Sequence, residues 1–454
     1  MIRIKLFVFT QECSCKFSPA ALNWFMPDYP QLVVANAAGE IFDLPDFHAA
    51  GRSGREIYPL DPAVLIPLPE NSRLYFLPQR LPLGYARKSR VPQRLDEHTA
   101  VAAFLPPGYT IFSVAAYQRQ PEAPLLPIYA YSAVCWYRGK FHVPALRVDD
   151  DVKHDPAQFS LNKIKKLVER RREQFPQNRL IAHHGVNCAL RYGCPNAQNL
   201  FLERWEAPIA VSAACNAACV GCISEQPADT VQSPHDRLTF VPTIEEIIEV
   251  AVPHLNSAPQ AMISFGQGCE GEPLLQGMLI AAAIKKIREH TNRGTIHLNT
   301  NGSRPETVSR LIDAGLDSIR VSLNSVREPI YTAYYQPRGY RFSDVSESIH
   351  RARSSGLWTS INYLSFPGVT DDAEEFAALS HLIETSELNM IQWRNLNIDP
   401  DWYIESLALR EASKFLGMPI LLQKIREKFP QVRFGYFNPP VKVAQTALSV
   451  RHIF

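Results

Sequence analysis

The chain has 454 residues, a length that suggests about two or three domains. Of these residues 46% are hydrophobic, which is enough for a large packed core. Its 47 lysines and arginines nearly balance its 45 aspartates and glutamates. This balance excludes a protein that coats nucleic acid through overall charge. No apolar run reaches the roughly 20 residues that a membrane-spanning helix needs. The apolar N-terminal run meets Gln11 and Glu12 too soon for an export signal, so we expect a soluble cytoplasmic protein.

Residues 1–155 are rich in proline, tyrosine and phenylalanine, and they contain short β-prone runs such as 109–114 and 127–131. Turn residues separate these runs, which is typical of antiparallel sheets. We therefore expect a mostly β accessory domain. Residues 156–204 are expected to form a helical connector, which includes a charged helix over 161–174 and the segment with Cys188 and Cys194.

From residue 205 to 400 the pattern alternates between short β-prone runs and helical segments. Strands are expected near Ile209, Met262, Thr295, Ser318, Thr359 and Met390. Helices are expected over 243–254, 275–290, 306–314, 345–355 and 373–385, the first with Thr243 as N-cap and Glu246 completing a capping box. Six such β/α units predict a parallel α/β sheet, either open or closed into a partial barrel. Residues 401–454 are expected to form a C-terminal helical extension and tail.

One face of several predicted strands is polar. His297 and Asn299 alternate with apolar residues on the third strand, as Arg320, Ser322 and Asn324 do on the fourth. Side chains one residue apart on a strand point to opposite faces, and a closed barrel fills its interior with apolar side chains. The pattern therefore favours an incomplete, TIM-like barrel whose interior holds a polar ligand, over chance alternation in an ordinary sheet.

Three cysteines follow the first of these strands. The chain has nine cysteines and no export signal is expected, so metal binding is favoured over disulfide bonds. Cys215, Cys219 and Cys222 fall within eight residues. A structural zinc site normally has four protein ligands. Three thiolates suit a four-iron cluster that keeps one iron open for another ligand.

This arrangement resembles the radical S-adenosylmethionine (radical SAM) superfamily, whose Cys-x3-Cys-x2-Cys motif follows the first strand of a partial (β/α)6 barrel. Cys215, Cys219 and Cys222 match that motif residue by residue. Further resemblance over residues 205–400 implies that SAM is bound by Gly271, Glu272, Pro273, Asn299, Ser322 and Asn324. Gly271, Glu272 and Pro273 match the last three residues of the family's Gly-Gly-Glu-Pro motif, which holds the methionine amino group.

The resemblance implies a [4Fe-4S] cluster that cleaves SAM reductively to a 5′-deoxyadenosyl radical, which abstracts hydrogen from a substrate. The sequence does not identify this substrate. A low-potential electron donor, such as a flavodoxin or ferredoxin, is the implied partner, and we expect no membrane or nucleic-acid partner. Two alternatives stay open: a radical SAM enzyme that modifies a nucleic-acid base, and a non-catalytic scaffold that binds an iron–sulfur cluster or zinc.

Two positions depart from the family pattern. Gly221 replaces an aromatic residue before the third cysteine, and Glu270 replaces the first glycine of the Gly-Gly-Glu-Pro motif. Cys269, just before this motif, is a candidate catalytic residue as a hydrogen-atom donor or substrate-linking thiol. It is also a candidate metal ligand or a small buried residue.

A second metal centre, either an auxiliary iron–sulfur cluster or a zinc ion, is a further hypothesis. Cys188 and Cys194 follow the pair His183 and His184, although their spacing matches no known metal motif. Additional ligands would then come from the remaining thiols, which are Cys13, Cys15 and Cys135.

Overall fold

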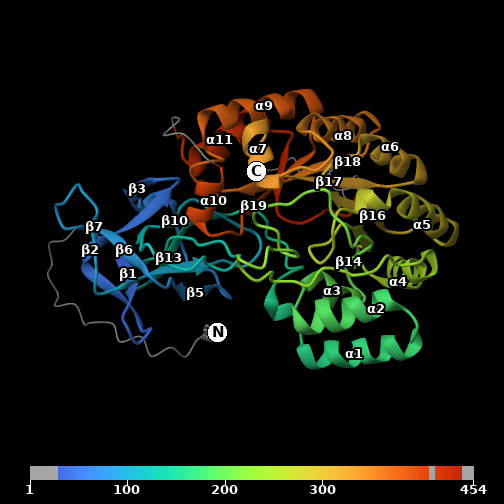
Figure 1. Ribbon diagram of the computed structural model, residues 1–454, viewed down its shortest axis with the longest axis horizontal. Helices are drawn as coiled ribbons and strands as arrows, with labels where there is room; N and C mark the ends of the chain where they lie inside the picture. The colour runs from blue at the N-terminus through green and yellow to red at the C-terminus, as the bar shows by residue number, and fades with distance from the viewer. Residues whose placement is uncertain (1–28, 408–414, 442–454) are drawn as a thin grey trace. The chain divides into compact units, whose positions relative to one another are not determined.

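The structure, a computed structural model, describes residues 29–407 and 415–441 and divides into two compact units (Figure 1). The first unit comprises the described residues up to Arg147, together with those of Ser365–Ala373 and Asn395–Lys424. The second comprises Val148–Leu364, Glu374–Arg394 and the described residues from Ile425 onward. Cys13 and Cys15 lie outside the described residues.

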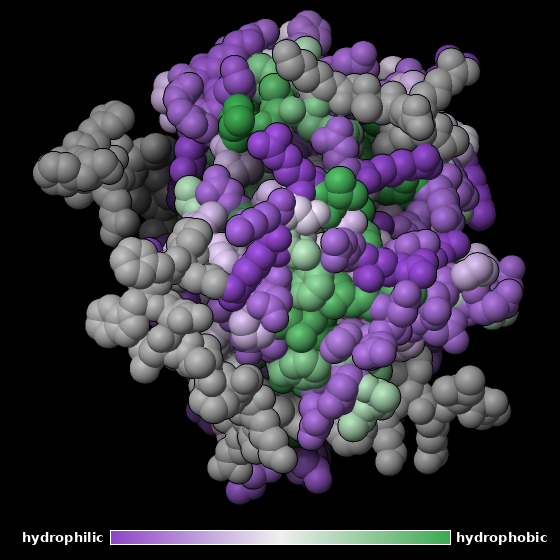
Figure 2. All heavy atoms as spheres, turned by 90° about the vertical axis from the view of Figure 1, so that its left-hand side faces the viewer, coloured by the Kyte–Doolittle hydropathy of each residue, from purple (hydrophilic) through white to green (hydrophobic). Residues whose placement is uncertain are grey.

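The first unit is built on a 13-stranded antiparallel sheet, which confirms the expected β-rich N-terminal region. Its central strand order is β11-β6-β2-β1-β12-β13-β4. The strands are β1 (Gln31–Ala35), β2 (Ile41–Ser53), β3 (Glu56–Pro59), β4 (Leu65–Pro67), β5 (Arg73–Phe76), β6 (Arg80–Ala86), β7 (Gln93–Arg94), β8 (Thr99–Phe104), β9 (Tyr109–Ile111), β10 (Val114–Ala115), β11 (Tyr117–Arg119), β12 (Cys135–Tyr137) and β13 (Lys140–Arg147). Small residues such as Ala102 and Ala115 pack with larger ones such as Leu77 and Tyr117 in its core. On the side of β2 and β6, Figure 2 shows an apolar strip flanked by polar side chains.

A buried ion pair holds two distant segments of the first unit together. The guanidinium of Arg80 donates to Asp399 at 2.8 Å, and neither side chain is exposed to solvent. Asp399 also accepts from the Leu126 N–H at 2.9 Å and from the N–H groups that begin α10 (Pro400–Ser406). These additional hydrogen bonds offset part of the cost of burying both charges.

The second unit contains a seven-stranded sheet in the order β14 to β20. Its strands are β14 (Glu206–Ile209), β15 (Met262–Phe265), β16 (Thr295–Thr300), β17 (Ser318–Leu323), β18 (Trp358–Ser365), β19 (Met390–Asn395) and β20 (Arg433–Gly435). β14 to β18 pair in parallel, as do β19 and β20. The predicted α/β sheet is therefore confirmed. β20, however, is a seventh strand within the segment that the sequence predicted to be a helical extension.

Helices follow most of these strands (Figure 1). The helices α1 (Leu161–Gln174), α2 (Arg179–Ala182) and α3 (Pro195–Phe201) precede β14. The helices after the strands are α4 (Ile244–Ser257), α5 (Gly277–His290), α6 (Pro305–Ala314), α7 (Glu328–Tyr335), α8 (Phe342–Ser354), α9 (Ala373–Ser386) and α11 (Met418–Lys428). The short 3₁₀ helices are η1 (Pro62–Val64), η2 (Pro156–Gln158) and η4 (Pro273–Gln276), and η3 (His183–Arg191) is a π-helix of nine residues. Among the described residues, no helix is both long and apolar enough to span a membrane.

The capping box predicted at Thr243 and Glu246 is present at the start of α4. The Glu246 N–H donates to the Thr243 side chain at 3.2 Å, and the Thr243 N–H donates to the Glu246 carboxylate at 2.8 Å. The guanidinium of Arg179 also donates to this carboxylate and holds the pKa of Glu246 down to about 2. Short-range signals of this kind are readable because both partners lie within one helical turn.

Asn438, which follows β20, shows that the sheet curls. Its side-chain N–H group donates to Glu206 on β14 at 2.9 Å and lies 3.4 Å from the side-chain oxygen of Asn299 on β16. The Gln392 side chain of β19 donates to the Asn438 oxygen at 2.9 Å. Strands from opposite ends of the sheet thus share one polar network, as expected for a barrel-like curvature around a polar interior.

Candidate active site

The cysteine loop, residues 212–222, leaves the C-terminal end of β14 and is supported on one side by the loop that follows β15. The Gly271 N–H donates to the Ser212 carbonyl at 2.7 Å, and the Glu272 N–H donates to the Ala214 carbonyl at 2.9 Å. A Cβ atom at Gly271 would lie 2.0 Å from the Ala214 oxygen. Glycine is therefore required at this position because the two loops approach each other closely.

The tyrosine-rich helix α7 supports the other side of the cysteine loop. The N–H groups of Ala218 and Val220 donate to the carbonyls of Tyr335 and Tyr334 at 3.0 and 2.9 Å. The Tyr335 ring stacks on that of Tyr331, with 4.4 Å between the centroids. All three tyrosines are buried, so they form a rigid apolar wall next to the loop.

Asn216 fixes the loop to the end of β16. Its side-chain oxygen accepts from Asn301 at 2.9 Å, and its side-chain N–H donates to Ser303 at 2.9 Å. Its carbonyl accepts from the Arg338 N–H at 2.8 Å. Sequence reasoning did not identify Asn216, because its partners are 85 and 87 residues away.

The three loop thiols influence one another electrostatically. Burial, followed by the neighbouring thiols of Cys222 and Cys215, raises the pKa of Cys219 well above its usual value. Burial and the Glu272 carboxylate raise the pKa of Cys215 to about 11. The guanidinium of Arg237 lies 3.5 Å from the Cys222 sulfur and opposes these increases for Cys215 and Cys219. The donor set, three thiols on one loop with a guanidinium beside Cys222, fits a negatively charged iron–sulfur cluster.

Glu270, the departure from the family motif, clasps the ends of two strands. One carboxylate oxygen accepts from the N–H groups of Val211 and Ser212 at 2.7 and 2.9 Å. The other accepts from those of Gly266 and Gln267 at 2.9 and 2.7 Å. Burial raises the pKa of this carboxyl to about 8, against the effect of the four N–H donors. The residue therefore positions the start of the cysteine loop relative to β15.

Glu272 joins the loop after β15 to the end of β16. Its carboxylate accepts from the Thr300 hydroxyl and from the N–H groups of Leu274 and Asn301, the last two at 3.0 and 2.9 Å. Burial, its largest influence, raises its pKa to about 7. Oε2 accepts only the Asn301 bond among those of the described residues and has a lone pair left for a ligand.

Comparisons with known proteins address the same part of the chain. Residues 209–380, which include the cysteine loop and the loops after β15, β16 and β17, match the model of the radical SAM superfamily. The name radical SAM domain is used for residues 209–380 because they match this model. Similar proteins include the GTP 3′,8-cyclase of Streptomyces coelicolor, 30% identical over 197 residues, 43% of this chain and 54% of that protein. The FeMo cofactor biosynthesis protein NifB of Klebsiella pneumoniae is 25% identical over 195 residues, 39% of this chain and 40% of that protein.

The similar proteins with solved structures have lower sequence identity to this chain. Methylornithine synthase (PylB) is 14% identical with a TM-score of 0.36, over 61% of this chain and 71% of that one. The chain spans about half the length of the first curated relative it matches, 54% of that protein.

The other predicted SAM ligands lie at the C-terminal ends of the radical SAM domain's strands. Pro273 begins η4, next to Glu272. The side-chain oxygen of Asn299 accepts from Nε2 of His297 at 3.0 Å, and its side-chain N–H donates to the Phe265 carbonyl at 3.3 Å. Ser322 accepts from Asn362 at 3.4 Å, and Asn324 donates to the Ile330 carbonyl at 3.4 Å. Asn299 and Ser322 thus lie on the neighbouring strands β16 and β17, while Pro273 and Asn324 lie just after β15 and β17.

Charged side chains lie close to Arg320 on β17. The Arg320 guanidinium donates to Gln392 at 2.9 Å, and burial together with the nearby Arg394 lowers its pKa to about 9. Glu206 is the carboxylate that acts on both Arg320 and His297. Because burial lowers the pKa of His297 to about 4, that ring is neutral at pH 7. A pair of neighbouring guanidinium groups, those of Arg320 and Arg394, suits an anionic ligand.

Cys269 does not join the cysteine loop. Its thiol interacts with Cys188 and His183, and a hydrogen bond with Cys188, together with burial, raises its pKa well above the usual value. Cys188 belongs to η3, upstream of the radical SAM domain. The structure therefore brings together two cysteines that the sequence separates by 81 positions.

Proposed function

We propose that this protein is a radical SAM enzyme in which Cys215, Cys219 and Cys222 bind a [4Fe-4S] cluster. The observation that carries the proposal is the cysteine loop, whose backbone is held by the loop after β15, by α7 and by the end of β16. This support would present the three thiols to one cluster. When bound, the cluster and SAM supply a 5′-deoxyadenosyl radical, which abstracts hydrogen from a substrate.

The chain's own residues would bind and orient SAM around this loop. Glu272 would accept from the methionine ammonium through the free lone pair of Oε2, while Thr300 and Asn301 fix the carboxylate. The backbone of Gly271, with Pro273, Asn299, Ser322 and Asn324, would complete the contacts. The buried rings of α7 would exclude water from this side of the site.

The substrate class is proposed from charge. Arg320 and Arg394 would bind a carboxylate or phosphate group in the interior of the domain.

A low-potential electron donor such as a flavodoxin or ferredoxin would be required for this reaction. The seven described cysteines, all of them free, fit the reducing conditions of the cytoplasm. The second metal centre considered for Cys188 is a separate proposal, because its side chains lie outside the cysteine loop.

Reductive cleavage of SAM tests this function. Anaerobically reconstituted protein, supplied with SAM and dithionite, should form 5′-deoxyadenosine and methionine even without substrate, at a rate above that of protein lacking the cluster. Protein that holds an intact cluster but forms no 5′-deoxyadenosine would favour the non-catalytic scaffold.

Replacing Glu272 tests its proposed contact with SAM. We expect Glu272→Gln to weaken SAM binding by about 10- to 100-fold, because the variant loses a charge-assisted hydrogen bond at nearly constant shape. Equilibrium dialysis of the reconstituted proteins would measure the difference. Glu246→Gln is the matched control, since the Glu246 carboxylate is also buried and accepts from the backbone N–H groups of Thr243 and Arg179, but it lies on α4. Equal SAM affinity of the two variants would reject this role for Glu272.

A further inference from the structure

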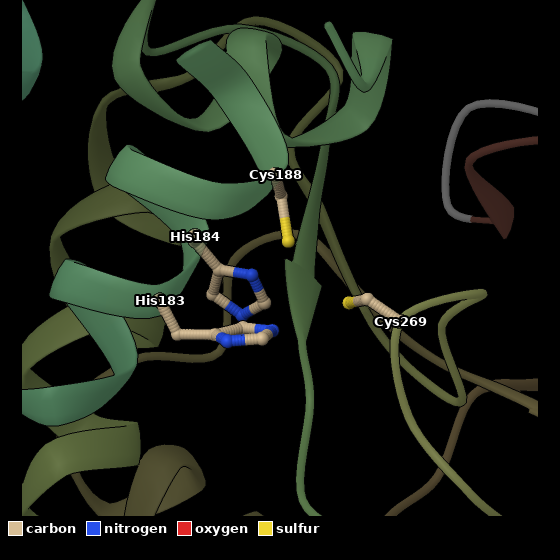
Figure 3. Close-up of side chains that lie close together, drawn as sticks. All are labelled: His183, His184, Cys188 and Cys269. Atoms are coloured by element: carbon tan, nitrogen blue, oxygen red, sulfur yellow. The ribbon is translucent and has the colours of Figure 1, made fainter. Parts of the chain in front are cut away.

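Four buried side chains outside the cysteine loop converge on one point (Figure 3). His183, His184 and Cys188 come from η3, and Cys269 comes from the loop after β15. One ligand atom of each lies within 4.8 Å of a ligand atom of every other. All four residues are buried, and Figure 3 shows the two sulfur atoms directed toward the imidazole rings.

The local backbone explains why three of these side chains share a face. η3 is a π-helix, in which the hydrogen bonds join residues five apart instead of four. This wider turn brings Cys188 over both His183 and His184, which precede it by five and four positions. π-Helices are rare and are frequently found at functional sites.

Each histidine also has a buried nitrogen without a hydrogen-bond partner of normal geometry among the described residues. These atoms are Nε2 of His183 and Nδ1 of His184. The other nitrogen of each ring does have a partner: Nδ1 of His183 lies 3.4 Å from the Asn187 side chain, and Nε2 of His184 lies 3.3 Å from the Ala210 N–H. An unpartnered buried nitrogen is costly unless a ligand satisfies it.

We propose that His183, His184, Cys188 and Cys269 bind one divalent metal ion, for which zinc is the best match. Two thiolates and two imidazoles are an established tetrahedral donor set for structural zinc. The compactness of the group fits one ion, because ligands divided between two irons of a cluster would lie farther apart. Four protein ligands complete the tetrahedral coordination, so this site needs no water as a ligand.

The His184 ligand has a cost. Binding through Nδ1 leaves the proton on Nε2, where it faces the Ala210 N–H, so this 3.3 Å contact must open when the metal binds. The structural gain is a cross-link between η3 and the residue directly before Glu270. Because Glu270 and Gly271 hold the cysteine loop, the metal would stabilise the support of the proposed radical site from behind.

Metal analysis of protein that cannot bind the iron–sulfur cluster tests this site. The full chain carrying Cys215→Ala, Cys219→Ala and Cys222→Ala together should be purified with zinc present. We expect about one zinc per chain by mass spectrometry of the metals. After removal of the zinc, Co²⁺ titration should give the absorption of a tetrahedral cobalt ion with thiolate ligands.

Single substitutions in the same background locate the metal. Cys188→Ser should weaken Co²⁺ binding by at least about 100-fold, because it removes a thiolate ligand. Cys194→Ser is the matched control, since it changes a cysteine of the same segment that lies outside the group, and it should bind Co²⁺ normally. Circular dichroism would verify that both variants are folded. Absence of zinc and of a tetrahedral cobalt spectrum in the unsubstituted background, or equal Co²⁺ affinity in both variants, would overturn the proposal.

Discussion

Cys219→Ala should lose the iron–sulfur cluster, the largest effect expected of any single substitution in this chain. Cys219 is the central thiol of the loop and interacts with both of the others. Two thiolates cannot hold a cube that needs three protein ligands, so iron and acid-labile sulfide should fall from about four of each per chain to near zero. Chemical analysis and the visible absorbance of anaerobically reconstituted protein would measure this loss.

Cys135→Ala provides the control for this substitution. Cys135 is a fully buried residue of the first unit, and its sulfur lies 3.6 Å from the His142 carbonyl. It precedes the first cysteine of the loop, Cys215, by 80 positions in the sequence. Its replacement should leave the iron and sulfide content unchanged. Full cluster content in Cys219→Ala would contradict the assignment of the loop as the cluster site.

Glu270→Ala should produce the largest loss of stability in the second unit. The substitution removes the acceptor for four N–H groups, two of which belong to the fully buried residues Val211 and Ser212. Each unsatisfied buried N–H costs about 1–3 kcal/mol, and water can reach those of Gly266 and Gln267 more readily. We therefore expect a loss of about 3–5 kcal/mol in the free energy of unfolding.

Urea denaturation of the cluster-free protein would measure this loss, and hydrogen exchange would assign it to the second unit. Amides after β14 should exchange faster in Glu270→Ala than in the unsubstituted protein. Glu289→Ala changes an exposed glutamate of α5 and should leave the urea midpoint unchanged. If both variants unfold at the same urea concentration, the four hydrogen bonds of Glu270 do not stabilise the second unit as we expect.

Features that depend on residues close in sequence could be predicted. The bounds of α1 match the charged segment 161–174, and the capping box at Thr243 was readable from two residues three positions apart. The alternation of strands and helices over 205–400 likewise predicted the parallel sheet. β20 was not predicted, because three residues are too few to show a period, and its pairing with β19 depends on the rest of the fold.

Features that depend on distant contacts could not be predicted. Glu270 seemed only a departure from a glycine motif, and its role depends on N–H groups up to 59 positions away. Asn216 and Asn301 meet because the ends of parallel strands lie on one edge of the sheet. The approach of Cys269 to Cys188 requires both the π-helix and the fold, so the spacing of the cysteines gave no indication of it.

Electron paramagnetic resonance of the reduced cluster, recorded with and without SAM, tests the central claim most directly. The claim is that three loop thiolates leave one iron open and that SAM binds to it. We predict that SAM changes the spectrum of the reduced cluster in the unsubstituted protein, and that this change requires a higher SAM concentration in Glu272→Gln. A spectrum that is identical with and without saturating SAM, in protein with a complete cluster, would contradict the account.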